Sequence, residues 1–270
     1  MATPITNNAL PPRRGFGVVG SLAPDLIRAL AKAAEDAGYA TFWSNDGIDG
    51  EGLAALHEAA SVTTAIRLAV GAIPLDRVNP ERIAARLDEL ALPADRLIVG
   101  VGSGGQPGGL RRVRDGVTVL RERTSAPIVI AAMGPKMCAL AGELAAGVLL
   151  DWASPAYAVR VAEIVAERAA QAGRPRPWVA SYVFTALGPA ARARLRHEAA
   201  YYAAIPAYAA HFTRIGAGPL QTLALGDDPP AIQHALRPFS TALDEPVVRA
   251  VVSEPTAENY LALLHAGSPS

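Results

Sequence analysis

Short apolar runs alternate with longer segments of helical periodicity along this chain. The run 127–132 is apolar throughout, as in strands that are buried on both faces. Gly134 and Pro135 then break the strand and open a helix with proline in its first turn, and Gly147 ends that helix before the next strand, 148–150. The segment therefore predicts a complete strand–turn–helix–strand unit.

The same alternation extends over most of the sequence. We predict eight strands, at 16–20, 39–44, 66–73, 97–101, 127–132, 148–150, 178–187 and 246–252. Helices are predicted between them, including 24–37, 80–92 and 256–265, and the longer segment 188–244 is expected to contain two or three helices. This alternation implies a parallel sheet. Eight units in 270 residues favour an α/β fold, a TIM-type (β/α)8 barrel formed as a single domain, over an open doubly wound sheet.

Composition and the chain ends narrow the class of protein. Residues 1–14 contain several prolines and no apolar stretch of a signal peptide, so we predict a flexible N-terminal tail at 1–14, a barrel at 15–270 and a cytoplasmic location. The 25 basic and 25 acidic residues cancel, which argues against nucleic acid as a partner, and no apolar run is long enough to span a membrane. The single cysteine, Cys138, excludes internal disulfides and is expected to be buried and inert.

Polar residues follow several of the predicted strands. Asp46, Asp76, Ser103 and Asp151 each come at or just beyond a strand end, where barrels of this class place their active sites. The histidines share no metal-ligand spacing, and no nucleophile motif is present, so metal catalysis and hydrolysis are disfavoured. The turn at Gly134 leaves backbone N–H groups at a helix N-terminus, which suits a phosphate, although an isolated Gly-Pro pair is also ordinary turn chemistry.

Four segments, taken together and in order, resemble the luciferase-like monooxygenase family. They are 35–46, 70–77 with 79–86, 99–102, and 131–136 with 141–143, spread over residues 15–266. The resemblance implies a TIM-type barrel that binds a flavin, either the deazaflavin coenzyme F420 or FMN, at the C-terminal ends of its strands. It also implies hydride transfer to or from a small organic substrate, or activation of dioxygen by the reduced flavin.

The resemblance also assigns residues. Asp46 is implied as the catalytic residue near the reactive ring edge, and Ala72 with Ile73 as a bulge, often with a non-prolyl cis peptide, that backs the ring. Met133, Gly134 and Pro135 would present backbone N–H groups to the phosphate. The remaining residues that we assign to the cofactor site are Gly102, Ser103, Lys136, Asp151 and Trp152, and those that we assign to the substrate site are Trp43 and Asp76. Without the family pattern, Ala72 and Ile73 are simply core strand and Asp46 an exposed turn residue.

The chain departs from the family pattern at several points. Gly47 follows Asp46, where deazaflavin-using relatives commonly carry His, and Gly105 and Gln106 stand where an acid is often found. Met133 replaces a small residue, and Asp151 brings a carboxylate near the expected phosphate. The connection between the fourth and fifth strands is short, whereas many relatives carry a long insertion there.

These departures leave two hypotheses. The first is a flavin- or deazaflavin-dependent oxidoreductase or monooxygenase; the second is a degenerate barrel that serves as a cofactor-binding or interaction protein. F420 is placed ahead of FMN because the Ala- and Arg-rich composition is typical of actinobacterial proteins, a lineage in which F420 is common. The substrate is not readable, since Trp43, Trp152, Tyr157, Tyr201, Tyr202 and Tyr208 fit either a pocket lining or the core. The oligomeric state is left open; the resemblance suggests a homodimer, since relatives are often dimers through helices that flank the third strand.

Overall fold

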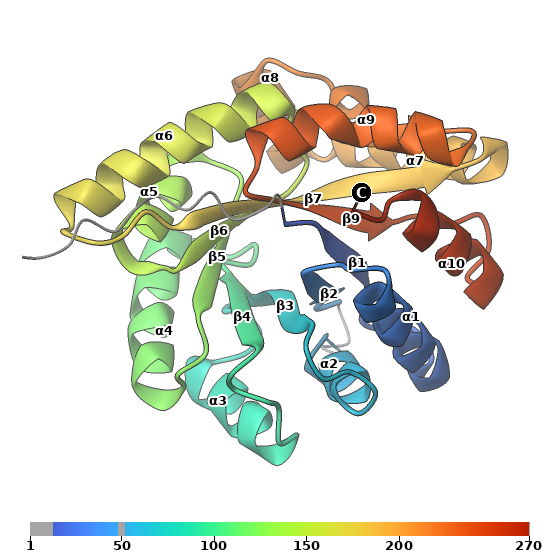
Figure 1. Cartoon of the computed structure of the whole chain (residues 1–270). Helices are drawn as coiled ribbons and strands as arrows, with labels where there is room; N and C mark the ends of the chain where they lie inside the picture. Colours follow the sequence, from blue (N-terminus) through green and yellow to red (C-terminus); the bar gives the residue numbers. More distant parts are fainter. Residues whose placement is uncertain (1–12, 48–51, 270) are drawn as a thin grey trace, which may run out of the picture.

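The strands form one closed ring with the helices outside it (Figure 1). The computed structural model describes residues 13–47 and 52–269. Within them the parallel strands pair in the order β6-β5-β4-β3-β2-β1-β9-β7, and pairing of β7 with β6 closes the ring. The predicted single-domain (β/α)8 barrel is therefore confirmed as a fold.

The bounds of the elements follow the predicted alternation. The strands are β1 Gly15–Val19, β2 Thr41–Asn45, β3 Arg67–Pro74, β4 Leu97–Gly102, β5 Ile128–Ala132, β6 Gly147–Leu150, β7 Trp178–Leu187, β8 Leu223–Gly226 and β9 Glu245–Ala250. The helices are α1 Pro24–Asp36, α2 Gly52–Ala60, α3 Pro80–Glu89, α4 Gly109–Arg123, α5 Pro135–Leu144, α6 Pro155–Gln171, α7 Pro189–Ala204, α8 Pro206–Ile215, α9 Pro229–Ala242 and α10 Ala257–Ala266, with a short 3-10 helix at Pro219–Thr222. Asn79 caps α3, because its Oδ1 accepts a hydrogen bond of 2.8 Å from the N–H of Arg82.

One strand was not predicted. Segment 188–244, expected to be helical, contains the three helices α7, α8 and α9 but also β8, which pairs with the end of β7 from Phe184 to Leu187. The start of β7 pairs with β9 instead, so β8 lies beside the ring and does not close it. A four-residue strand of this kind is specified by a distant partner strand, which local patterning does not reveal.

An irregularity in β3 shapes the middle of the barrel. The register between β3 and β4 shifts between Val70 and Ile73, and the peptide bond Gly71–Ala72 is cis, one residue before the pair for which we predicted a bulge. Two neighbouring residues, Tyr182 and Gly100, accommodate this part of the β3 backbone. The hydroxyl of Tyr182 donates a hydrogen bond of 2.6 Å to the carbonyl of Gly71, and a Cβ on Gly100 would lie only 2.4 Å from the Val70 carbonyl oxygen. Glycine is therefore required at position 100.

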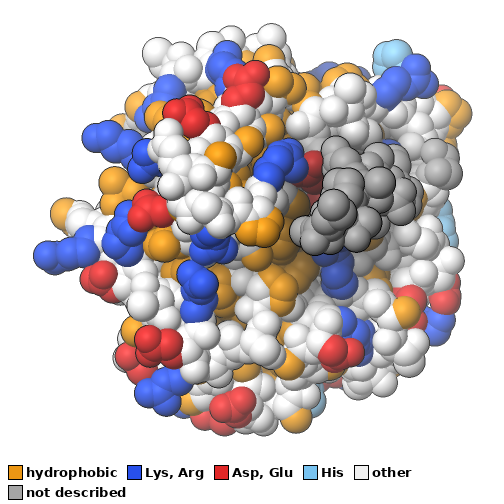
Figure 2. All heavy atoms as spheres, turned by 60° about the vertical axis from the view of Figure 1, so that its left-hand side comes forward, with side chains coloured by type: hydrophobic (Ala, Val, Ile, Leu, Met, Phe, Trp, Pro, Cys, Tyr) orange, Lys and Arg blue, Asp and Glu red, His pale blue; other side chains and the backbone are white. Residues whose placement is uncertain are grey.

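Charges of both signs are interspersed on the surface face drawn in Figure 2, as the zero formal net charge leads one to expect. Within residues 13–47 and 52–269 we find no helix with the length and hydrophobicity that crossing a bilayer requires. Cys138 is buried, as expected, and burial raises the pKa of its thiol to about 12.

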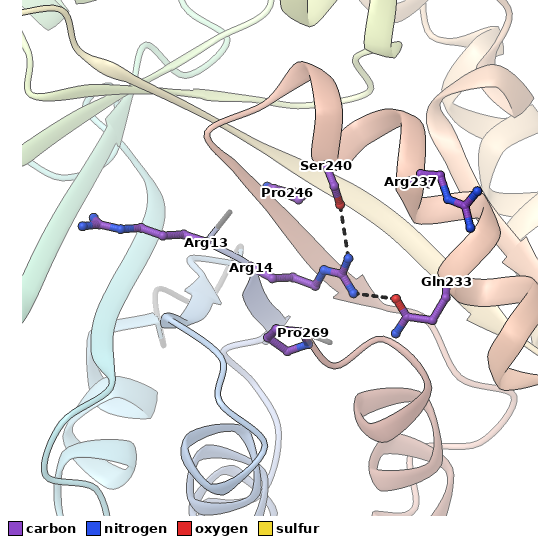
Figure 3. Close-up of a pocket in the computed structure, with 7 residues that line it drawn as sticks. All are labelled: Arg13, Arg14, Gln233, Arg237, Ser240, Pro246 and Pro269. Atoms are coloured by element: carbon purple, nitrogen blue, oxygen red, sulfur yellow. Dashed lines mark hydrogen bonds between the residues drawn. The ribbon is translucent and has the colours of Figure 1, made fainter. Parts of the chain in front are cut away.

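A hollow of about 330 Å³ at the N-terminal end of the barrel is organised around Arg14 (Figure 3). The guanidinium donates hydrogen bonds of 2.9 Å to Gln233 Oε1 and to the carbonyls of Gly267 and Ser268, and one of 3.2 Å to Ser240 Oγ. Arg14 thereby fastens the start of β1 to α9 and to the residues after α10, and its donors are used within the fold.

We expect Arg14→Ala to lower the free energy of unfolding by about 2–3 kcal/mol, because it leaves part-buried acceptors without a charged donor. Urea denaturation monitored by circular dichroism measures the change. Arg237→Ala is the matched control, since this side chain lines the same hollow but makes no hydrogen bond to the rest of the described chain. Equal losses in the two variants would refute the role given to Arg14.

Candidate active site

A cavity of about 710 Å³ opens at the C-terminal ends of the strands. Its lining comes from the ends of β3, β4, β5 and β6, from β7, from the loop before α4, from the start of α5 and from α8. The lining residues are Ala72, Pro74, Gly102, Ser103, Gly104, Gly105, Ala131, Ala132, Met133, Gly134, Met137, Leu149, Asp151, Tyr182, Ala207, Tyr208, Ala210 and Arg214. The cavity therefore lies where parallel barrels place their ligands.

The floor of the cavity is built from small residues on neighbouring strands. A Cβ on Gly102 would lie 3.5 Å from the Cβ of Ala72 and 3.6 Å from that of Ala131, so β3, β4 and β5 come close together there without a large side chain between them. Such a surface leaves room for a flat ring system and offers it apolar contact. Pro74, Met137 and Leu149 add to this apolar lining.

The N-terminus of α5 forms one end of the cavity. Gly134 is its N-cap residue, no side chain caps it, and the proline at the next position has no N–H. A Cβ on Gly134 would meet a single atom within 4 Å, Nη1 of Arg214 at 3.8 Å. Open space therefore lies between the positive end of a helix and a guanidinium group, an arrangement suited to an anion such as a phosphate.

Arg214 lies on α8 and was not among the residues predicted from the sequence. Its side chain is exposed, and no hydrogen bond or ion pair joins it to another residue in the described part of the chain. The positive charge is therefore available to a ligand. The charge of Arg214 also lowers the pKa of His211, although burial contributes more to that shift.

Asp151, directly after β6, brings a carboxyl group into the cavity. Its Oδ1 is buried and has no hydrogen-bond partner among the described residues. Burial raises the pKa of this carboxyl to about 7, against the opposing effects of the Arg249 charge and the backbone N–H of Trp152. Asp151 is thus poised to change its protonation state near neutral pH.

Trp152, the residue after Asp151, does not line the cavity but packs in the core next to it. The residue is fully buried with φ at 49°, and its ring stacks on Phe184 with centroids 4.4 Å apart. Its carbonyl oxygen lies 3.0 Å from Nε2 of the buried His211. These contacts hold the turn that follows Asp151.

The structure brings five further predicted residues to the cavity: Ala72, Gly102, Ser103, Met133 and Gly134. It does not bring the others there. Ile73 is buried in the core, Pro135 is exposed at the start of α5, and the exposed Lys136 lines a separate groove between α4 and α5. Arg214, which was not predicted, brings a positive charge to the cavity lining. Of the six aromatic residues weighed as pocket lining, Tyr208 alone lines the cavity within the described chain.

The other two acids at strand ends accept hydrogen bonds from the backbone. Asp46 Oδ1 accepts a hydrogen bond of 3.0 Å from the N–H of Gly52, and its side chain is not part of the cavity lining. Asp76 Oδ2 accepts hydrogen bonds from the N–H groups of Gly105 and Gln106, at 2.8 and 3.2 Å. Asp76 therefore fixes the glycine-rich loop that forms one wall.

Trp43, the other predicted substrate residue, is also part of the core. Its side chain is fully buried inside the barrel, with its indole N–H on Glu245 Oε1 at 2.8 Å. No three His, Cys, Asp or Glu side chains gather as a metal site within residues 13–47 and 52–269.

Several known proteins share this fold. The F420-dependent tetrahydromethanopterin reductase from Methanopyrus kandleri superposes with a TM-score of 0.71 at 19% identity, over 94% of this chain and 97% of that one. An F420-dependent secondary alcohol dehydrogenase, in complex with an F420–acetone adduct, gives 0.72 at 16% identity, over 94% and 99%. The FMN-bound oxygenating constituent of 3,6-diketocamphane monooxygenase from Pseudomonas putida gives 0.69 at 13% identity, over 94% and 96%.

Sequence comparison adds the family to the fold. A search of curated proteins finds no match to this sequence. The family model described as luciferase-like monooxygenase does match, over residues 8–115 and 107–238. The two matched ranges together span most of the barrel, which shows that the chain belongs to the luciferase-like monooxygenase family.

Proposed function

We propose that this protein is an oxidoreductase that uses F420, or alternatively FMN, bound in the cavity at the C-terminal ends of the strands. The observation that carries the proposal is the space between the uncapped N-terminus of α5 and Arg214, at one end of a floor of small residues. A phosphorylated cofactor with a planar ring has complementary parts: an anion for the helix end and a flat apolar surface for the floor.

Each group of residues has a distinct task in this proposal. The N–H groups at the start of α5 and the guanidinium of Arg214 would bind the phosphate. Ala72, Gly102 and Ala131 would back the ring, with the backbone of β3 held by Tyr182. When bound, such a cofactor supplies hydride transfer or, in its reduced form, reaction with dioxygen.

The choice of F420 over FMN follows the predicted preference and the F420-dependent proteins among the structural relatives. One wall of the cavity comes from α8, through Ala207, Tyr208 and Ala210. The connection between β4 and β5 is short and adds no long insertion to this wall. A small organic molecule is the proposed substrate, and the homodimer and the cytoplasmic location stay predictions.

Titration with F420 and with FMN, followed by cofactor fluorescence, tests this proposal. We expect a dissociation constant of about 1 μM or lower for at least one of them, about −8 kcal/mol. Gly102→Val, which adds methyl groups above the floor, should weaken that cofactor at least about 10-fold, whereas the exposed Gly218→Val should not. If neither cofactor binds the wild type, the second hypothesis, a barrel without this activity, takes the place of the first.

A further inference from the structure

Asp151 is the one acidic residue in the cavity lining that the structure describes. Asp46, which the family resemblance implied as the catalytic residue, accepts a hydrogen bond from the backbone of Gly52 and lies outside that lining. Redox chemistry at a carbon that bears oxygen requires a proton to leave or reach that oxygen as the hydride moves. A group in this cavity must therefore exchange the proton.

The surroundings of Asp151 suit such an exchange. Its buried Oδ1 has no partner within the described chain, so one hydrogen-bonding position is left for a ligand. The side chain follows β6 directly, and the turn behind it is held by the stacking of Trp152 on Phe184 and by the contact of the Trp152 carbonyl with His211. A buried acid on a rigid turn is well positioned to meet a bound molecule in a fixed geometry.

Charged and titratable groups face Asp151 from several elements. Arg249 on β9 favours the carboxylate, while Glu198 on α7 opposes it. The carboxylate in turn acts on the hydroxyls of Tyr182 on β7, Tyr202 on α7 and Tyr208 on α8, and burial is the main reason that the pKa values of all three are raised. These tyrosines stay neutral at pH 7. The Asp151 carboxyl is near the midpoint of its titration at that pH, since its pKa is raised to about 7.

We propose that Asp151 exchanges the proton with the oxygen of a small uncharged alcohol or ketone bound in the cavity. In the oxidative direction the O–H bond of the alcohol breaks and its proton passes to the Asp151 carboxylate. The carbinol C–H bond breaks with its electron pair, which leaves as hydride to the oxidised cofactor, and the C=O bond forms. In the reverse direction protonated Asp151 returns the proton to the carbonyl oxygen as the reduced cofactor gives up hydride. The inference rests on the proposed function, because it needs a hydride acceptor in the same cavity.

The apolar lining supports an uncharged substrate. Besides Asp151, the ionic group in the described lining is Arg214, which we assign to the phosphate. A charged substrate would therefore have no further ionic partner there, and its desolvation would be uncompensated.

Asp151→Asn, Asp46→Asn and the control Asp88→Asn, an exposed residue of α3, test the inference together. The first readout is the infrared carboxyl band of Asp-labelled protein without cofactor. We expect a buried carboxyl that titrates at about pH 7 in the wild type and is missing only in Asp151→Asn. Asp151→Glu identifies the same band if the asparagine variant fails to fold, because it removes the labelled residue and keeps the acid.

The pH dependence of stability is a second readout without cofactor. The carboxyl pKa is raised from 3.8 to about 7 on folding, so the folded state holds a proton that the unfolded state has released. The wild type should therefore lose stability relative to Asp151→Asn as pH rises from about 4 to about 7. A flat difference across this range would contradict a buried protonated acid.

Single turnover of the bound reduced cofactor with acetone, the simplest ketone, tests the catalytic role. Asp151→Asn should slow the reaction at least about 100-fold and remove its pH dependence, while the cofactor dissociation constant changes less than about 3-fold. Asp88→Asn should match the wild type. A full rate in Asp151→Asn, an effect confined to Asp46→Asn, or no reduction of acetone by the wild type would each overturn the inference. In each of these cases, cofactor binding by the wild type would still support the proposed function.

Discussion

Replacing Glu245 by Ala should lower the free energy of unfolding by about 3–5 kcal/mol. Glu245 begins β9 and is 1% exposed. Its two oxygens accept hydrogen bonds from Trp43 Nε1 at 2.8 Å and from Arg67 Nη2 at 2.9 Å, which joins three strands inside the barrel. The shorter side chain would leave a partly buried guanidinium and a buried indole N–H without their acceptor, and it would leave a cavity.

Two further variants separate charge from hydrogen bonding in this loss. Glu245→Gln keeps an acceptor for Trp43 and most of the volume, so it should cost less than Glu245→Ala. Glu89→Ala removes a carboxylate from exposed ion pairs with Arg82 and Arg86 and should cost less than about 1 kcal/mol. Urea denaturation of the three variants measures these differences. If Glu245→Ala costs no more than Glu89→Ala, the buried carboxylate does not stabilise the barrel.

Gly134→Val should weaken FMN binding about 300-fold, or about 3.4 kcal/mol, while changing riboflavin binding less than about 3-fold. The new side chain would occupy the space between the start of α5 and Arg214, where we propose that the phosphate binds. The fold should tolerate the change, because Gly134 has φ of −119° and ψ of 156°, which valine adopts readily, and the nearest atom is 3.8 Å away. Riboflavin has the same ring without phosphate, so it isolates the phosphate contact.

Arg214 variants test the same site from α8. Arg214→Gln should weaken FMN about 10- to 100-fold, with Arg214→Lys in between, because a charged hydrogen bond is lost and then partly restored. Lys136→Gln is the matched control, since the Lys136 side chain lies in the groove between α4 and α5. Equal weakening of FMN and riboflavin in Gly134→Val, or a larger effect of Lys136→Gln than of Arg214→Gln, would show that the phosphate binds elsewhere.

The barrel was predictable because each β/α unit carries its own local signals. Each unit is marked by its own apolar strand, by capping residues such as Asn79 and by proline at the helix start. A wrong prediction for one unit therefore does not change the prediction for the next. β8 lacked such a signal, since its four residues form a strand only by pairing with the end of β7. Long-range pairing therefore set the limit of the prediction.

The site was predictable as a location but not as a set of side chains. Residues at strand ends were expected at one rim, and Ala72, Gly102, Ser103, Met133, Gly134 and Asp151 line the cavity there. Three acids at strand ends look alike in the sequence, yet Asp46 and Asp76 accept backbone hydrogen bonds while Asp151 enters the cavity. Arg214 had no signal at all, because only the packing of α8 brings it near Gly134.

A crystal structure with F420 or FMN bound would show whether the cavity holds a phosphorylated flavin or deazaflavin. We expect the phosphate within hydrogen-bonding distance of the backbone at the start of α5 and of the Arg214 guanidinium. We also expect the ring against Ala72, Gly102 and Ala131. A cofactor bound outside this cavity, or one bound inside with its phosphate away from α5, would contradict the proposed site.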